Sequence, residues 1–548
     1  MNIRLNLVTV NSNRRAPRAR QLLLAGALWL AGAAAPVFGQ AFTSGDLLLS
    51  YGVYTGTAST ITVGQALPGG GNATVNGSYP NVFQNDIPDA SFGITEPIYI
   101  SELAPSGGAP VLTMNVTALA ASDGINLTTS FSSKSELTLN LSQDGTAVTF
   151  MGYNATSNLL DQSNANGPGL VDPTNPDAQI AQHMVGQLNA NGTITATPVD
   201  AYSGDNGRSA VLAGGFYYTA GSAGNGSGIE PSFIVKSSGI QMIAAGSTTG
   251  NATVVGMQQG TAGASNGYQF GYSVTENGYA ADKSGKDDNL RGLTLFNNTL
   301  YAAKGSGSKG IDTVYQIGTA GTLPTPGTAA NTTISVLPGF PTTLASNTSV
   351  PSAHPFGLWF ANADTLYVGD EGDGILGDAG NTTVDPYAGL EKWSFNGTIW
   401  HLDYILTAGL NLGTNYTVAN GSSGQVYPTS LDPANDGLRG ITGEVNGNGT
   451  VTIYGVTSTV STLADEGADP NELVSITDNL ADANITQASG EDFSTLQGGT
   501  YGEVLRGVSF APVPEPGTYA LALGAAGGLA ALWRRRKLAQ ARTVPSGR

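Results

Sequence analysis

The chain has 548 residues, only 11% of them charged, and its 40 acidic residues outnumber 22 basic ones to give a net charge of −18. It contains no cysteine, which excludes a disulfide framework, thiolate metal sites and a cysteine nucleophile. The acidic balance also argues against nucleic acid as a partner, because binding phosphates requires a basic surface.

The first forty residues predict a secretory signal peptide. They hold five arginines and no acidic residue, followed by an apolar run from Leu22 to Ala35. Small residues then place Val37 and Gly39 at the −3 and −1 positions of a cleavage site. A retained N-terminal anchor is the alternative, although the run is shorter than the ~20 residues of a membrane span.

Residues 41–512 form the body that would be exported. This body holds 39 acidic and 11 basic residues, a net charge of about −28. Its many Gly, Ser, Thr and Asn residues favour short strands joined by turns. It shows no helical periodicity of note, so the sequence predicts an all-β domain.

A pattern recurs through the body: Arg or Phe, a small residue, an apolar strand, a turn, and a second strand centred on an aromatic residue. Its copies begin at Arg208, Arg291, Phe356, Arg439 and Arg506, with a weaker one at Leu137. Steps of about 65 to 85 residues leave room for four short strands in each unit, which is typical of a β-propeller.

The last copy, Arg506–Phe510, lacks its second strand, and Gly45–Tyr51 at the other end of the body supplies one. The sequence therefore predicts a single propeller of six four-stranded blades whose two ends share one blade. Strand-like runs in 52–135 and 240–285 leave a seventh blade open, and an array of β-sandwiches is the alternative architecture.

The four arginines of the body all stand at the start of a repeat, each with a carboxylate three residues earlier. The pairs are Asp205 with Arg208, Asp288 with Arg291, Asp436 with Arg439, and Glu503 with Arg506. Equivalent positions of a propeller meet at one end of its channel, so these pairs are expected at a channel mouth. They would either brace the blades or present guanidinium groups to an anionic ligand.

An acidic, glycine-rich stretch follows the Phe356 repeat. Asp370, Asp373 and Asp378 could supply oxygen ligands to calcium, although their spacing does not match an EF-hand loop. A solvated acidic loop is the alternative reading. No other cofactor is indicated.

The sequence offers no catalytic residues. His183, His354 and His401 are scattered, without metal-ligand spacing. The Gly263–Gly267 segment has the letters of a nucleophile elbow but lacks the strand and helix around it. His354 is the histidine placed to reach the channel, which leaves an extracellular propeller hydrolase or lactonase as the alternative function.

The C-terminal segment, 513–537, has three parts. A motif of Val513, Pro514, Glu515 and Pro516 precedes an apolar run, Gly517–Trp533, which predicts one transmembrane helix. A basic cluster follows, made of Arg534, Arg535, Arg536 and Lys537. Its charge predicts that the tail, 538–548, stays in the cytoplasm.

This order of motif, span and arginines resembles the PEP-CTERM sorting signal. The resemblance implies an exosortase as processing partner, Pro514, Glu515 and Pro516 as its recognition residues, and a producing cell that secretes exopolysaccharide. The body is also similar to a group of uncharacterised exported bacterial propeller-like proteins, through Phe356–Asp370, Tyr404–Leu412 and Leu505–Pro512.

The expected function is therefore that of an exported surface or matrix protein whose propeller displays a binding face. It would pass through the inner membrane and end at the cell surface, the outer membrane or the extracellular matrix. Extracellular polysaccharide or other surface proteins are the expected partners, and nucleic acid is not. The propeller hydrolase or lactonase stays open beside it, because propellers support both kinds of function.

Overall fold

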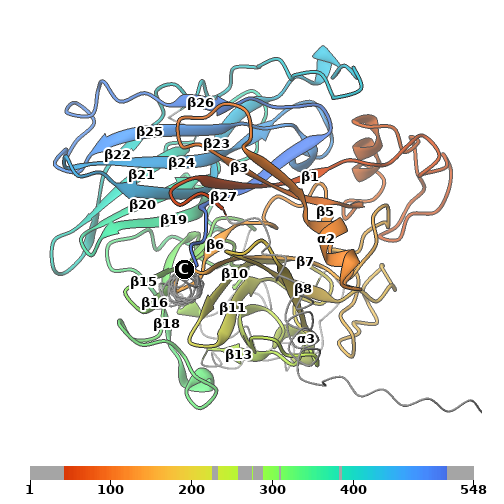
Figure 1. Ribbon diagram of the computed structural model, residues 1–548, viewed down its shortest axis with the longest axis horizontal. Helices are drawn as coiled ribbons and strands as arrows, with labels where there is room; N and C mark the ends of the chain where they lie inside the picture. The colour runs from red at the N-terminus through yellow and green to blue at the C-terminus, as the bar shows by residue number, and fades with distance from the viewer. Residues whose placement is uncertain are drawn as a thin grey trace, which may run out of the picture. The chain divides into compact units, whose positions relative to one another are not determined.

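The computed structural model describes residues 42–224, 232–256, 274–275, 288–307, 310–381 and 385–514. Within these ranges the regular structure is almost entirely β, in six sheets of four or five strands and one sheet of two. The six larger sheets are the blades of a β-propeller (Figure 1), which confirms the predicted fold and the count of six.

Five blades are consecutive in the chain. Blade 2 contains β6 (Asn140–Leu141), β7 (Ala147–Tyr153), β8 (His183–Asn189) and β9 (Ile194–Val199). Blade 3 contains β10 (Gly207–Ala213), β11 (Phe216–Gly221), β12 (Gly239–Ala244) and β13 (Thr253–Val255). Blade 4 contains β15 (Leu293–Phe296), β16 (Thr299–Lys304), β17 (Thr313–Ile317) and β18 (Ile334–Val336), and the short β14 (Val274–Thr275) pairs in parallel with β18.

The next two blades have the longest strands. Blade 5 contains β19 (Pro355–Asn362), β20 (Thr365–Asp370), β21 (Gly389–Phe395) and β22 (Trp400–Leu406). Blade 6 contains β23 (Ala434–Val445), β24 (Thr450–Val460), β25 (Leu473–Asn479) and β26 (Ser494–Gln497). Neighbouring strands within both blades run antiparallel.

Blade 1 joins the two ends of the body. Its strand order is β27 (Glu503–Phe510), β1 (Leu47–Val53), β3 (Ile98–Leu103) and β4 (Leu112–Asn115). Leu47 lies opposite Phe510 and Leu49 opposite Val508. The predicted sharing of one blade by the two ends is therefore confirmed, and it closes the sheet edges that an open array would expose.

The remaining elements are short. They are the strand pair β2 (Thr95–Glu96) and β5 (Thr129–Ser130), the helices α2 (Val116–Ser122) and α3 (Ser232–Val235), and the 3₁₀ turns η1 (Asn81–Asp86), η2 (Ala329–Asn331), η3 (Thr429–Leu431) and η4 (Glu466–Ala468). In the described part of the chain no helix is long and apolar enough to cross a membrane.

The core consists of separate apolar layers between neighbouring blades. Because side chains alternate along a strand, each blade buries one set of residues against each neighbour. In β20, Leu366 and Val368 face blade 4 while Tyr367 faces blade 6. In β1, Leu47 and Leu49 likewise pack against blade 6. The apolar patterns of the repeat thus stack the blades around a common axis.

The first strand of every blade lines the central channel. Residues from β6, β10, β15, β19, β23 and β27 surround one cavity of about 210 Å³. Leu141, Val211, Leu295, Leu358 and Phe510 line it together with the polar Asn140, Thr294, Thr442 and Ser509, so this end of the channel is mixed in character and, within the described part of the chain, carries no charged side chain.

A further apolar cluster lies outside the blade layers. It brings Ile61, Phe83 and Phe92 from the segment between β1 and β2 together with Val418 and Tyr427 from the loop between blades 5 and 6. Phe83 stacks on Phe131 at 5.4 Å between ring centroids. This cluster places the 86–92 segment beside the arginines described below.

Asn471 links blade 6 to the closing strand. Its side-chain amide donates to the carbonyls of Thr457 (2.8 Å) and Leu505 (3.0 Å), and its oxygen accepts from the backbone N–H of Leu505 (2.8 Å). All three groups are buried, so each needs its partner.

Replacing Asn471→Ala should therefore lower the free energy of unfolding by about 2–4 kcal/mol, because it leaves buried backbone groups without partners. Chemical denaturation of the purified protein measures this. Asn448→Ala, at an exposed turn of the same blade, is the matched control and should change stability by less than about 0.5 kcal/mol. Equal effects of the two changes would contradict the proposed link.

Several carboxyl groups away from the channel are fully buried. Burial raises the pKa of Asp161 to about 8, with Asp89 adding to the effect. Burial likewise raises the pKa of Asp469 to about 8 and that of Glu96 to about 7. The folded protein therefore binds protons near neutral pH that the unfolded chain, with ordinary carboxyl pKa values, has released.

Because the folded state holds the extra protons, stability should fall as the pH rises through about 7 to 8. The melting temperature is expected to be higher at about pH 6.5 than at about pH 8.5. Asp161→Asn should reduce this difference, since an amide does not titrate. A melting temperature that rises across this interval would contradict the prediction.

A polar cluster and two cavities at one mouth of the channel

The first strands of neighbouring blades meet backbone to backbone where the repeats begin. A Cβ atom at Gly292 would overlap the carbonyl oxygen of Phe356 in the next blade, and one at Gly357 would overlap that of Arg439. A Cβ at Gly507 would lie 2.5 Å from the carbonyl oxygen of Leu137. The small residue of the repeat is therefore required by the close approach of the next blade.

The arginine before this small residue reaches across to other blades. Arg208 donates to the Asn289 side chain and to the carbonyl of Leu290 (3.3 Å) at the entry to blade 4, and it lies 3.4 Å from Asp205. Arg506 donates to the carbonyls of Phe131 and Gly467. Burial lowers the pKa of Arg506 to about 9, and the nearby Arg439 adds to this effect.

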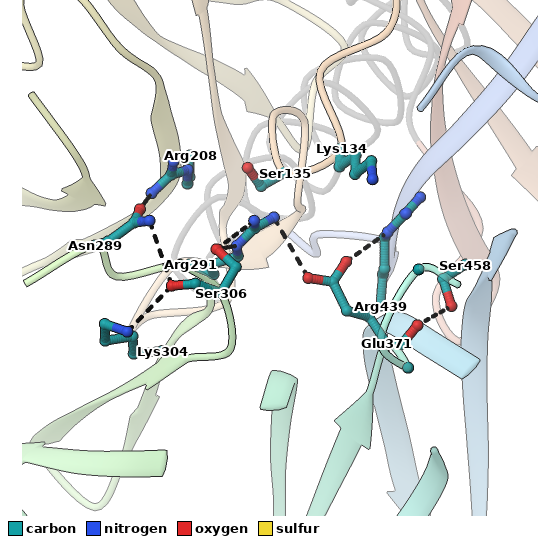
Figure 2. Close-up of polar contacts among 12 residues, drawn as sticks. Lys134, Ser135, Arg208, Asn289, Arg291, Lys304, Ser306, Glu371, Arg439 and Ser458 are labelled. Carbon is teal, nitrogen blue, oxygen red and sulfur yellow. Dashed lines mark hydrogen bonds and ion pairs between the residues drawn. The ribbon is translucent and has the colours of Figure 1, made fainter. Parts of the chain in front are cut away.

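Glu371, directly after β20, lies between two of the arginines. Its Oε1 is 3.5 Å from Nη1 of Arg291 in blade 4, and its Oε2 accepts from Nε of Arg439 in blade 6 at 2.9 Å. Figure 2 shows the carboxylate between the two guanidinium groups, with Ser306 bonded to Arg291 at 2.8 Å. Burial opposes ionisation of Glu371, but Arg291 and Arg439 outweigh it and lower its pKa to about 2.

The other carboxylates of the predicted pairs have different neighbours. Asp288 accepts from the Ser238 hydroxyl at 3.0 Å. Asp436 accepts from the backbone N–H of Gly374 at 2.8 Å, while Arg439 binds Glu371. Glu503 begins β27 and is half-buried. The structure thus brings the arginines to one mouth, and the carboxylate that joins two of them is Glu371, which the repeat did not single out.

A cavity of about 330 Å³ opens beside Arg208 and Arg291. Its walls are mostly hydroxyl, amide and charged groups: Ser91, Ser130, Ser132, Ser133, Ser135, Ser163, Asn164, Asn206, Lys134, Asp86, Asp465 and Glu466, with Ala90 and Phe92 at one side. Lys134 pairs with Glu466 at 3.2 Å. Burial, with Asp465 and Glu466 nearby, raises the pKa of Asp86 to about 7. We call this the serine cavity.

A second cavity, of about 180 Å³, shares Lys134 and Arg291 with the first. Glu371 and Arg439 line it on one side, and His354, Asp373 and Asp436 on another. Behind these three lie Asp370 and Asp385, both buried. We call this the acidic cavity.

The carboxylates at the acidic cavity form two overlapping groups. His354, Asp370 and Asp385 place one ligand atom each within 4.8 Å of one another, and so do Asp373, Asp385 and Asp436. Burial raises the pKa of Asp436 to about 7 and raises that of Asp385, the latter against the effect of His354. Asp370 and Asp373, two of the three calcium candidates, belong to these groups, and Asp378 lies outside both.

His354, Asp385 and Asp436 come from separate segments of the chain, and no spacing in the sequence connects them. The acidic stretch after β20 was the only sequence signal for this cluster. Lys134 lies between repeats, so the repeat pattern gave no reason to single it out. Trp393 and Trp400 are buried between blades 4 and 5, as part of the core.

These features define an all-β propeller with a charged, polar cluster at one mouth of its channel. The model of the PEP-CTERM protein-sorting motif matches residues 512–537, so the chain carries this motif, which implies export and sorting by an exosortase. Val513 and Pro514 end the described part of the chain. Glu515, Pro516, the predicted helix 517–533, the cluster of Arg534, Arg535, Arg536 and Lys537, and the signal peptide 1–40 lie outside it.

No curated protein matches the chain. Among solved structures it is similar to the parainfluenza virus 5 hemagglutinin-neuraminidase ectodomain, with a TM-score of 0.35 and 12% identity over 83% of this chain and 93% of that one. AztD from Citrobacter koseri gives a TM-score of 0.26 and 9% identity over 76% and 98%. The apocarotenoid oxygenase of Synechocystis gives 0.33 and 8% over 76% and 72%. At these TM-scores the fold description rests on the chain's own sheets.

Glu371→Gln should destabilise the protein by about 3–5 kcal/mol, because it leaves the buried Arg439 and the partly buried Arg291 without their shared counter-charge. Urea or guanidinium denaturation measures the loss. Glu444→Gln, at an exposed position in blade 6, is the control and should leave the midpoint nearly unchanged. A Glu371→Gln protein as stable as the parent would mean that Glu371 does not hold the three blades together.

Proposed function

We propose that this chain is a non-enzymatic, carbohydrate-binding propeller of the cell surface or extracellular matrix. The sorting motif supports export by way of the inner membrane and an exosortase. The single observation that carries the binding function is the composition of the serine cavity. Its ligand would be a segment of the exopolysaccharide outside the producing cell.

The serine cavity offers the hydrogen-bonding groups that a sugar requires. A sugar hydroxyl both donates and accepts, and serine hydroxyls and asparagine amides match both roles. Lys134, Arg208 and Arg291 add donors, and Asp86, Asp465 and Glu466 add acceptors. A volume of about 330 Å³ is within the usual size of small-molecule sites.

Charge indicates which polysaccharide is favoured. Three basic side chains of the serine cavity stand against three acidic ones, and burial raises the pKa of Asp86 to about 7, so the cavity carries only a small net charge at neutral pH. The body around it carries about 28 net negative charges, which repel a polyanion at long range. An uncharged or amino-sugar-containing polymer fits both facts better than a strongly acidic one.

Co-sedimentation of the purified chain with exopolysaccharide from the producing cells tests this function. Ala90 is exposed and lines the cavity, so Ala90→Trp should fill the site without disturbing the core and weaken binding at least tenfold. Ala363→Trp, at an exposed turn of blade 5, is the matched control and should bind like the parent. Absence of saturable binding, or equal binding by both variants, would refute the proposal.

A second candidate function, an extracellular hydrolase or lactonase, is favoured by one observation. His354, Asp373 and Asp436 converge on the acidic cavity, and general acid–base chemistry needs such groups within reach of a bound substrate. Turnover of ester and lactone substrates that is lost in Asp436→Asn but kept in Asp364→Asn, at an exposed turn, would favour this candidate over the binding protein.

A further inference from the structure

We propose that His354, Asp370, Asp373, Asp385 and Asp436 form a calcium site at the junction of blades 5 and 6. The site is independent of the carbohydrate-binding function, because it uses none of the residues that line the serine cavity.

Four segments of the chain bring the ligands together. His354 precedes β19, Asp370 ends β20 and Asp373 follows it, Asp385 precedes β21, and Asp436 lies in β23 of blade 6. Both groups of three place their ligand atoms within 4.8 Å of one another, and Asp385 belongs to both. Calcium binds oxygen at about 2.4 Å, so two ligands on opposite sides of the ion are about 4.8 Å apart. The spacing therefore suits a shared ion.

The state of Asp385 points to a ligand. Asp385 is 6% exposed, and the backbone N–H groups of Tyr387 and Ala388 interact with its carboxylate, yet within the described residues neither carboxylate oxygen accepts a hydrogen bond of ordinary geometry. Its carboxylate oxygens lie within 4.8 Å of a ligand atom of His354 and of each of the other three acids. One oxygen of Asp436 and Nδ1 of His354 are also buried without a hydrogen-bond partner. Buried polar atoms normally have partners, and a cation would supply the shared one.

The remaining contacts orient the ligands. Asp370 accepts from the backbone N–H groups of His354 (2.5 Å) and Gly372 (3.0 Å), and Asp436 accepts from Gly374 (2.8 Å). Each bond holds a carboxylate in place while leaving room for a further interaction at its oxygens.

The donor set selects calcium among common divalent ions. Four carboxylates, two in strands and two in loops, supply hard oxygen atoms, and one nitrogen completes the set. Magnesium requires a stricter octahedron, and zinc favours nitrogen and sulfur. His354, Asp373 and Asp436 line the acidic cavity, which provides a path for the ion.

The test uses the full-length chain, purified in mild detergent and dialysed against EDTA. Calorimetric titration with CaCl₂ should show binding near one ion per chain. Calcium at about 1 mM should raise the melting temperature by at least about 4 °C, because the ion binds only the folded site.

Asp385→Asn and Asp436→Asn should each weaken calcium binding at least tenfold. In EDTA both variants should melt at the parent's temperature or above it, because each removes a buried negative charge. Asp364→Asn is the matched control and should bind calcium like the parent. Weaker calcium binding together with an unchanged melting temperature in EDTA distinguishes an ion ligand from a residue that only supports the fold. If one of the two variants does not fold, the other is sufficient for the test.

Three results would overturn the proposal. They are no binding heat and no rise in melting temperature with calcium, a calcium response that survives in Asp385→Asn and Asp436→Asn, or tighter binding of Zn²⁺ or Mn²⁺ than of Ca²⁺. Loss of calcium binding in Ala90→Trp is not expected. The outcome here therefore does not depend on whether exopolysaccharide binds.

Discussion

Glu371 receives one guanidinium group from blade 4 and one from blade 6, and so holds three consecutive blades together at the polar mouth of the channel. This contact depends on how closely the first strands approach there. Gly292, Gly357 and Gly507 permit backbone-to-backbone contact with the next blade. Arg291 and Arg506, directly before Gly292 and Gly507, are then close enough to reach a neighbouring blade, and burial strengthens the ion pairs of the arginines at this mouth. The two cavities of the polar mouth are lined by these arginines.

The two mouths of the channel differ because one is lined by the first strands themselves and the other by loops between strands. At the first, leucine, valine and phenylalanine lie beside uncharged polar side chains around a small cavity. At the other end the loops between strands contribute serines, asparagines and charged groups. Turn sequences carry polar residues because they are solvated, so the mouth built from loops is the one equipped for recognition.

The polar mouth holds two kinds of chemistry side by side. The serine cavity has matched charges and many hydroxyl groups, which suits an uncharged polar ligand. Around the acidic cavity lie buried carboxylates, and several of their oxygen atoms have no hydrogen-bond partner among the described residues. Lys134 and Arg291 lie between the two cavities and line both. A cation at the acidic cavity and a sugar in the serine cavity would therefore be neighbours, separated by Lys134 and Arg291.

The sequence by itself determined the all-β class, the six repeats, the shared closing blade and the sorting motif. These features can be recognised from short segments of sequence. The strand patterns repeat along the chain, and Arg506–Phe510 lacks a partner strand that Gly45–Tyr51 supplies.

The tertiary structure alone decided the site. Asp385 and Asp436 are 51 positions apart in the numbering and meet because blades 5 and 6 pack face to face. In the sequence Glu371 is one residue of an acidic loop, and only the structure shows that it lies between Arg291 and Arg439. Strands can be predicted locally because the alternation of apolar and polar residues is visible within a few neighbouring positions. Ion pairs and ligand sets depend instead on which distant segments the closed ring of blades brings together.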